Sequence, residues 1–125
     1  MAKETCLCKP TEVLIFPCSG GSNVGQIANE AAKELTTRGL GKMYCLAGIG
    51  GHISGIIEST KAAKKIIAID GCPVGCARKT LKHADCPVTV HVVVTELGIK
   101  KSSDFHLDDK DIVKVENAVK EKLKK

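Results

Sequence analysis

Cysteine is the residue type in this chain with the clearest chemical potential. The 125 residues contain seven cysteines, and an odd number argues against a framework in which every thiol is paired within the chain. Cysteine clusters in a reducing compartment more often bind metal or carry out redox chemistry. The spacing of the cysteines therefore decides which chemistry to expect.

Three of the cysteines, Cys18, Cys45 and Cys72, follow one another at intervals of 27 residues. This interval is about the length of one strand–helix unit, and each cysteine lies at or near the end of a predicted strand. Loops that follow parallel strands emerge on one edge of a sheet. Cys76 stands four residues after Cys72, where a tight turn over 73–75 could aim both sulfurs at one point. We expect one thiolate site at this edge.

Four thiolates in tetrahedral arrangement suit zinc, and they could equally hold an iron–sulfur cluster. A helix N-terminus favours the thiolate form that metal binding requires, and Cys18 and Cys76 stand at predicted helix starts. Cys45 lies within an apolar run, so on position alone it fits a buried packing residue as well as a ligand. Cys86 precedes the last predicted strand at the opposite edge and is interpreted as structural.

The elements that must position these cysteines alternate along the chain. Apolar runs at 13–16, 43–47, 66–69 and 88–94 predict strands, the third being apolar throughout as expected for a strand covered on both faces. Helical spacing of apolar residues predicts helices over 23–39, 53–60, 77–84 and 108–123, with Asn23 and Gln26 resembling a capping box at the start of the first.

This alternation predicts an α/β domain with βαβ units and right-handed crossovers. We expect a three-layer, Rossmann-like or flavodoxin-like fold with a mostly parallel sheet of about four strands. The length of 125 residues suits a single domain spanning 1–125. Residues 1–10, which carry Cys6 and Cys8, are expected to form a loose arm.

Composition and charge argue against several classes of partner. The net charge is +5, but the lysines are scattered or gathered at the C-terminal helix end, where they complement the helix dipole. Phe16, Tyr44 and Phe105 are the only large aromatic residues, too few to stack nucleic-acid bases. The sequence shows neither a signal peptide nor an apolar run long enough for a membrane span. It predicts a cytoplasmic protein with no nucleic-acid or membrane partner; it names no small-molecule or protein partner and no oligomeric state.

Several motifs resemble the DGC-domain family, named for its central Asp-Gly-Cys. They are the segments 17–20, 45–50, 69–73 and 76–81, which read PCSG, CLAGIG, IDGCP and CARKTL, and the resemblance extends from about Val13 to Val94. Members of this family are described as zinc-binding because of four potential chelating cysteines, and their function is otherwise unknown. The resemblance implies the same role for Cys18, Cys45, Cys72 and Cys76, and it strengthens Cys45 in particular.

A cysteine-dependent enzyme is the competing class of function. Cys72 and Arg78 satisfy the C-x5-R pattern between a strand and a helix, the layout of cysteine-dependent phosphatases and arsenate reductases, in which a thiolate attacks while loop amides hold the oxyanion. Pro73 removes one amide and Lys79 replaces the usual hydroxyl residue. Thiol redox chemistry, through Cys72 with Cys76 or Cys18, is a further alternative. The sequence assigns no catalytic residue.

Neighbouring residues could tune the thiolate site. Asp70 ends its strand at the same edge, where it could hold a partner of the site or cap the next helix. Ser19 begins a small-residue loop that suits either an anion or a tight turn. His52 could be an alternative ligand or a loop residue. The other histidines, His83, His91 and His106, are interpreted as surface or packing residues.

Overall fold

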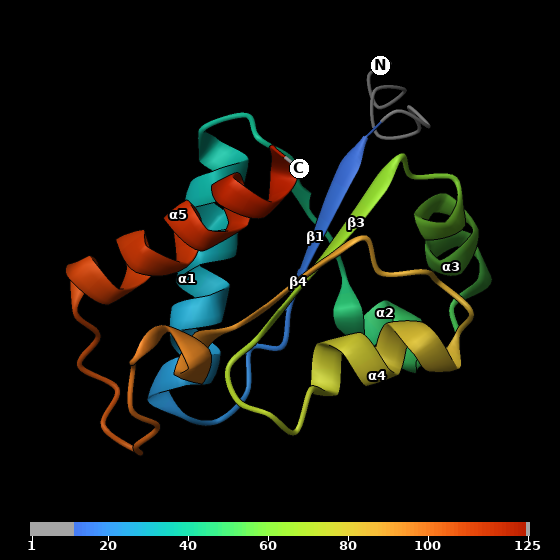
Figure 1. The fold of residues 1–125 in the computed structure, drawn as a ribbon. Helices are drawn as coiled ribbons and strands as arrows, with labels where there is room; N and C mark the ends of the chain where they lie inside the picture. The colour runs from blue at the N-terminus through green and yellow to red at the C-terminus, as the bar shows by residue number, and fades with distance from the viewer. Residues whose placement is uncertain (1–11, 125) are drawn as a thin grey trace.

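The computed structural model describes residues 12–124 (Figure 1). The expected arm and its Cys6 and Cys8 lie outside these residues. The strands are β1 (Val13–Pro17), β2 (Lys42–Met43), β3 (Lys65–Asp70) and β4 (Val90–Val93). The helices are α1 (Asn23–Thr37), α2 (Leu46–Gly50), α3 (Ser54–Lys61), α4 (Cys76–His83) and α5 (Asp109–Leu123), with a 3-10 helix, η2, over Val94–Leu97.

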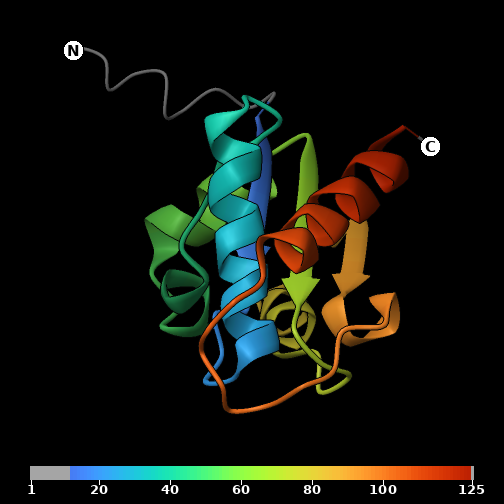
Figure 2. The same ribbon diagram turned by 90° about the vertical axis from the view of Figure 1, so that its left-hand side faces the viewer.

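The strands form one parallel sheet in the order β2-β1-β3-β4. Helices α1 and α5 cover one face and α2, α3 and α4 the other (Figures 1 and 2). Ile15, Ile67 and Ile69 pack under α1 and α5, whereas Leu14 and Phe16 face the other layer. This confirms the three-layer α/β fold and the four-strand parallel sheet expected from the alternating pattern.

The second strand is shorter than the apolar run over 43–47 predicts. Pairing with β1 ends when Tyr44 N–H donates to the Ile15 carbonyl at 2.9 Å. The Cys45 carbonyl then accepts from the N–H groups of Gly48 and Ile49 at 3.1 and 3.3 Å and starts helix α2. Ile49 is fully buried in the core beneath α2 and α4. Burial of this side chain favours a helix directly after Cys45. This is a tertiary effect that the apolar run does not predict.

The start of α1 also differs from the expected capping box. Ser22 is the N-cap, and its hydroxyl accepts from Gly25 N–H at 3.2 Å. The Asn23 amide instead donates to the Lys100 carbonyl at 2.8 Å, and the Gln26 amide donates to the Gly20 carbonyl at 3.0 Å. The side chains expected to cap the helix therefore fasten neighbouring loops to it.

The remaining elements follow the sequence pattern closely. Strand β4 stops at Val93 because the chain turns into η2, where Thr95 N–H donates to the Gly71 carbonyl at 3.1 Å. Helix α5 has the expected acidic start, with Asp108 as N-cap accepting from Lys110 N–H at 2.9 Å. Within residues 12–124, no helix combines the length and apolar composition needed to cross a bilayer.

Candidate thiol site

The carboxyl ends of the strands meet at one edge of the sheet, at the bottom of Figure 2. Cys18 follows β1, and its N–H donates to the Ile69 carbonyl at 2.9 Å, which extends the β1–β3 pairing. Cys72 follows β3 by two residues, and Cys76 is the first residue of α4. Cys45 follows β2 and occupies the N-cap position of α2. The parallel topology thus brings all four predicted ligands to the same end of the domain.

Asp70 organises this edge. Its carboxylate is 1% exposed and accepts from the N–H groups of Ala77 and Arg78 in the first turn of α4, at 2.7 and 3.2 Å. The same carboxylate contacts His91 Nε2 at 2.8 Å. The helix-capping interpretation of Asp70 matches these contacts. The link to His91, which the sequence suggested to be a surface or packing residue, was missed because only the β3–β4 register brings the two side chains together.

Gly71 is required by close packing of backbones. A Cβ at this position would lie 2.7 Å from the nitrogen of Gly25 in α1 and 2.8 Å from the carbonyl carbon of Val24, closer than any real Cβ contact. A Cβ on Gly25 would in turn lie 2.5 Å from the Gly20 oxygen. The Asp-Gly-Cys motif therefore combines a helix cap, a backbone contact and an edge cysteine in three successive residues.

Cys18 is partly buried, and its Sγ accepts from Gly71 N–H at 3.3 Å. Burial raises the pKa of the Cys18 thiol, hydrogen bonds from the Gly20 and Gly71 backbones oppose the rise, and the nearby Asp70 and Cys76 add to it. The expected thiolate-favouring effect of the helix start is therefore outweighed in the metal-free chain. The desolvation penalty on the anion exceeds the help from the amides.

Cys18 and Cys45 face a common cavity. This thiol cavity has a volume of about 460 Å³ and is lined by Pro17, Cys18, Ser19, Met43, Tyr44, Cys45, Leu46, Ala47, Gly50 and Thr80. Cys45 is exposed, which disagrees with the buried-packing interpretation of that residue. Thr80 is one turn beyond Cys76 on α4, and its hydroxyl donates to the Cys76 carbonyl at 2.7 Å.

Ser19 contributes to this cavity through an unusual backbone. Its φ of 53° lies in the left-handed region, and its hydroxyl donates to Asn29 Oδ1 at 2.9 Å. The Gln26 amide also donates to the Ser19 carbonyl, at 3.2 Å. Both contacts tie the loop to α1, so Ser19 acts as a turn residue that shapes the wall beside Cys18.

Cys72 and Cys76 flank a turn in which Gly75 adopts a φ of 69°. Cys72 is partly buried and packs against the core beneath α1 and α5, whereas Cys18 packs against the core on the other face. Cys76 is exposed. Among residues 12–124, no group of three or more cysteine, histidine, aspartate and glutamate side chains is placed to hold a metal ion.

Lys101 is a neighbour of the site that the sequence did not single out. Its Nζ lies 3.6 Å from Cys72 Sγ. Lys101 belongs to the polar loop after η2, and Asn23 fastens this loop to α1 by donating to the Lys100 carbonyl and accepting from Ser102 N–H. The lysine reaches Cys72 only through this long-range contact, so no local spacing signal could have identified it.

The other candidates do not border the thiol cavity. His52 is exposed, and its ring packs edge-on against His83 at a centroid distance of 5.5 Å. Cys86 is 1% exposed in the core, as its structural interpretation requires. Arg78 borders a different cavity, between α4 and β4, and its backbone N–H already donates to Asp70. The N–H groups of Ala77 and Arg78 are therefore engaged by Asp70 and are not available to hold an oxyanion.

The fold and these residues define a class: parallel α/β domains with cysteines at the carboxyl edge of the sheet. The model of the DGC domain matches residues 14–119, and the chain belongs to this family. It is also 38% identical, over 88 residues, to the "Anaerobic and virulence modulator AnvM" of Pseudomonas aeruginosa. The matched segment covers 70% of this chain and 67% of that relative. No solved structure matches the chain significantly.

Proposed function

We propose that this protein binds a thiophilic metal ion, most favourably zinc, through Cys18, Cys45, Cys72 and Cys76. The observation that carries the proposal is that Cys18 and Cys45, which are distant in sequence, line one cavity. Sulfur donors select zinc or iron–sulfur clusters over the hard ions magnesium and calcium. Bound zinc would supply a fixed positive charge that stabilises the thiolates and holds the loops together.

The remaining two sulfurs can join this pair by local movement. Cys45 and Cys76 are exposed, so their side chains can turn without disturbing the core. Cys76 is the first residue of α4, and Thr80, one turn further along this helix, borders the thiol cavity. Cys72 has to turn from the α1 and α5 side, and the loop over 71–75 that carries it is short and includes Gly75 in a left-handed conformation.

The surroundings suit an anionic metal centre. Four thiolates around Zn²⁺ leave a net charge of about −2, of which a Lys101 ammonium that stays near Cys72 would offset one unit. A zinc ion with four protein ligands has no open position for a substrate. The proposed role is therefore metal handling or metal-dependent folding rather than hydrolysis.

Metal content of the full chain tests this proposal. Protein purified without oxygen should contain about one zinc per chain and be colourless, whereas an iron–sulfur protein absorbs visible light. In a chelator competition, Cys18→Ser and Cys45→Ser should each weaken zinc binding at least roughly tenfold. A Cys6→Ser/Cys8→Ser double variant is the matched control and should bind as the native chain does.

Two outcomes would refute the proposal. One is zinc binding that survives Cys18→Ser and Cys45→Ser but disappears in the double variant, because the metal would then belong to the N-terminal cysteines. The other is the absence of any stoichiometric metal in protein whose thiols are fully reduced.

A thiol redox role is the second candidate, and the cavity shared by Cys18 and Cys45 favours it. The relative AnvM is named for an anaerobic role, and a thiol site that responds to oxidants would be consistent with that name. An added dithiol oxidant such as diamide would take two electrons and two protons from the thiols and leave a disulfide. Peptide mapping should then find a Cys18–Cys45 bond that dithiothreitol reverses; oxidation confined to Cys6 and Cys8 would exclude this role for the edge cysteines.

A further inference from the structure

We infer that the cavity between α4 and the edge strand β4 is a second site, which binds a small molecule through a phosphate group. This basic cavity has a volume of about 610 Å³, enough for a small phosphorylated ligand. None of the four edge cysteines borders it, and it shares no lining residue with the thiol cavity. The inference is therefore independent of the proposed metal site.

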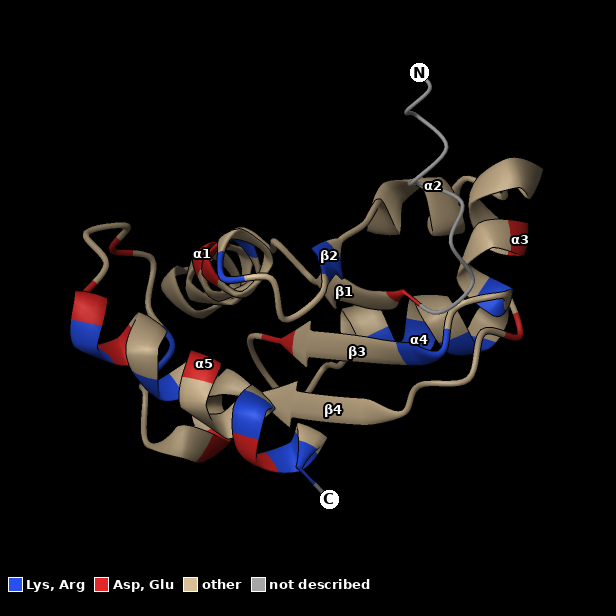
Figure 3. Ribbon diagram, turned by 90° about the horizontal axis from the view of Figure 1, so that it is seen from above, with Lys and Arg blue, Asp and Glu red and all other residues tan. Residues whose placement is uncertain are grey.

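Two cations on one face of α4 supply the attraction for an anion. Arg78 and Lys82 are one helical turn apart, so their side chains project toward the same side, and both border the cavity. Helix α4 contains basic residues and no aspartate or glutamate, as Figure 3 shows. Guanidinium and ammonium groups are the side chains that most often hold phosphate oxygens.

His91 provides a fixed hydrogen-bonding group on the opposite wall. The ring is about a quarter exposed, and its Nε2 lies 2.8 Å from the carboxylate of Asp70, which is 1% exposed. An ionised carboxylate only accepts hydrogen bonds, so the Nε2–H of His91 donates to Asp70 and this hydrogen bond fixes the ring. Nδ1 is then the hydrogen-bond acceptor of the ring, so it can meet the P–OH group of hydrogen phosphate, and the orientation of the ring is set before binding.

The other polar groups of the wall are already engaged within the protein. The Thr89 hydroxyl donates to the Ile66 carbonyl at 2.9 Å, and the Cys86 thiol contacts the Ala84 carbonyl at 3.7 Å. Pro87 and Val88 add apolar surface. Apart from Asp85, the groups free to meet a ligand are the Arg78 and Lys82 cations and the His91 ring, and the two cations favour an anion over a neutral polyol.

Asp85 is the one acidic residue that borders the cavity, and it opposes an anion. It follows the C-cap of α4 with a φ of 59°, and the Asp85 and Cys86 N–H groups donate to the Lys82 and Leu81 carbonyls. This pattern is a Schellman motif, in which glycine or asparagine is preferred. Asparagine at this position keeps the turn and removes the charge. Asp85→Asn and Lys82→Gln should therefore change the affinity for an anion in opposite directions.

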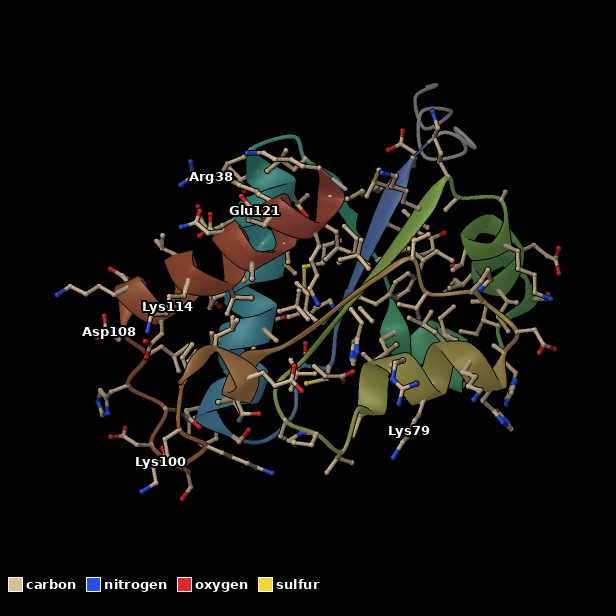
Figure 4. The ribbon with its side chains drawn as sticks, in the orientation of Figure 1. Arg38, Lys79, Lys100, Asp108, Lys114 and Glu121 are labelled. Atoms are coloured by element: carbon tan, nitrogen blue, oxygen red, sulfur yellow. The ribbon has the colours of Figure 1, made fainter. Side chains whose placement is uncertain are left out.

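The test is a titration of the full, isotopically labelled chain with inorganic phosphate, followed by amide NMR at constant ionic strength. Saturable shifts are expected for residues 78–91. Lys82→Gln should weaken binding roughly three- to tenfold, and Asp85→Asn should strengthen it about twofold or more. The matched control is Lys79→Gln: Lys79 extends outward from the same helix (Figure 4) and does not border the cavity.

Phenyl phosphate should bind more tightly than inorganic phosphate if Pro87 and Val88 contact the rest of the ligand. The inference is overturned if the shifts do not saturate by about 50 mM phosphate, a concentration at which even weak sites fill. It is also overturned if acetate binds as tightly as phosphate, if the shifts are confined to the turn over 71–76, or if Lys79→Gln and Lys82→Gln weaken binding equally.

Discussion

Replacing Asp70 by asparagine should destabilise the protein strongly, because one buried carboxylate holds three donors. It accepts from Ala77 N–H at 2.7 Å and Arg78 N–H at 3.2 Å and pairs with His91 Nε2 at 2.8 Å. Hydrogen bonds to a charged group contribute about 1.5–3 kcal/mol each. The asparagine oxygen can replace one acceptor, but its NH₂ group would face a second donor. We expect a loss of about 2–4 kcal/mol in the free energy of unfolding.

Equilibrium unfolding in urea measures this loss. The midpoint of Asp70→Asn should fall while the slope stays constant, which indicates that the change is in stability and not in the compactness of either state. Asp104→Asn is the matched control, because Asp104 is an exposed loop residue, and it should leave the urea midpoint nearly unchanged. A loss below about 1 kcal/mol for Asp70→Asn would refute the argument that this carboxylate organises the start of α4.

Three further variants probe the same edge and the helix starts. Gly71→Ala should cost about 1–3 kcal/mol or more, because its Cβ would meet the α1 backbone, which cannot move aside as a side chain can; unchanged stability would show that α1 shifts freely. Asp108→Ala should cost about 1 kcal/mol through loss of the α5 N-cap, and an unchanged urea midpoint would contradict this role. The pKa of Cys18 is higher in the folded chain than its unfolded value of 9.0. The stability linked to this shift is therefore fully present below pH 9.0 and is lost as the pH rises through the folded pKa. Cys18→Ser should therefore lose less stability than the native chain between pH 8 and 10, and an equal loss in both would contradict the pKa direction.

The alternation of apolar runs predicted the layered fold because it reflects burial. The run 66–69 is apolar at every position, and β3 lies in the middle of the sheet with helices on both faces. The prediction was wrong where two elements compete for one apolar run. Residues 43–47 read as a strand, yet β2 ends at Met43 because the burial of Ile49 starts α2 directly after Cys45.

The four edge cysteines could be predicted from topology, since parallel strands place their following loops at one end. The side of the sheet edge that each sulfur faces could not be predicted. Cys18 turns toward the α2 and α4 layer and Cys72 toward the α1 and α5 layer. The two differ because Cys18 directly follows β1, whereas Cys72 lies two residues beyond the end of β3. Their joint role as metal ligands stays a prediction.

The sequence by itself determined the order of the elements, the parallel sheet and the end of the domain where the cysteines gather, because these follow from periodicity and chain connectivity. Only the tertiary structure decided which polar groups meet. Lys101 reaches Cys72 through a loop fastened by Asn23, and Asp70 reaches His91 across two paired strands. Such contacts join residues far apart in the chain, and their geometry is set by packing and register, which no local pattern of residue types records.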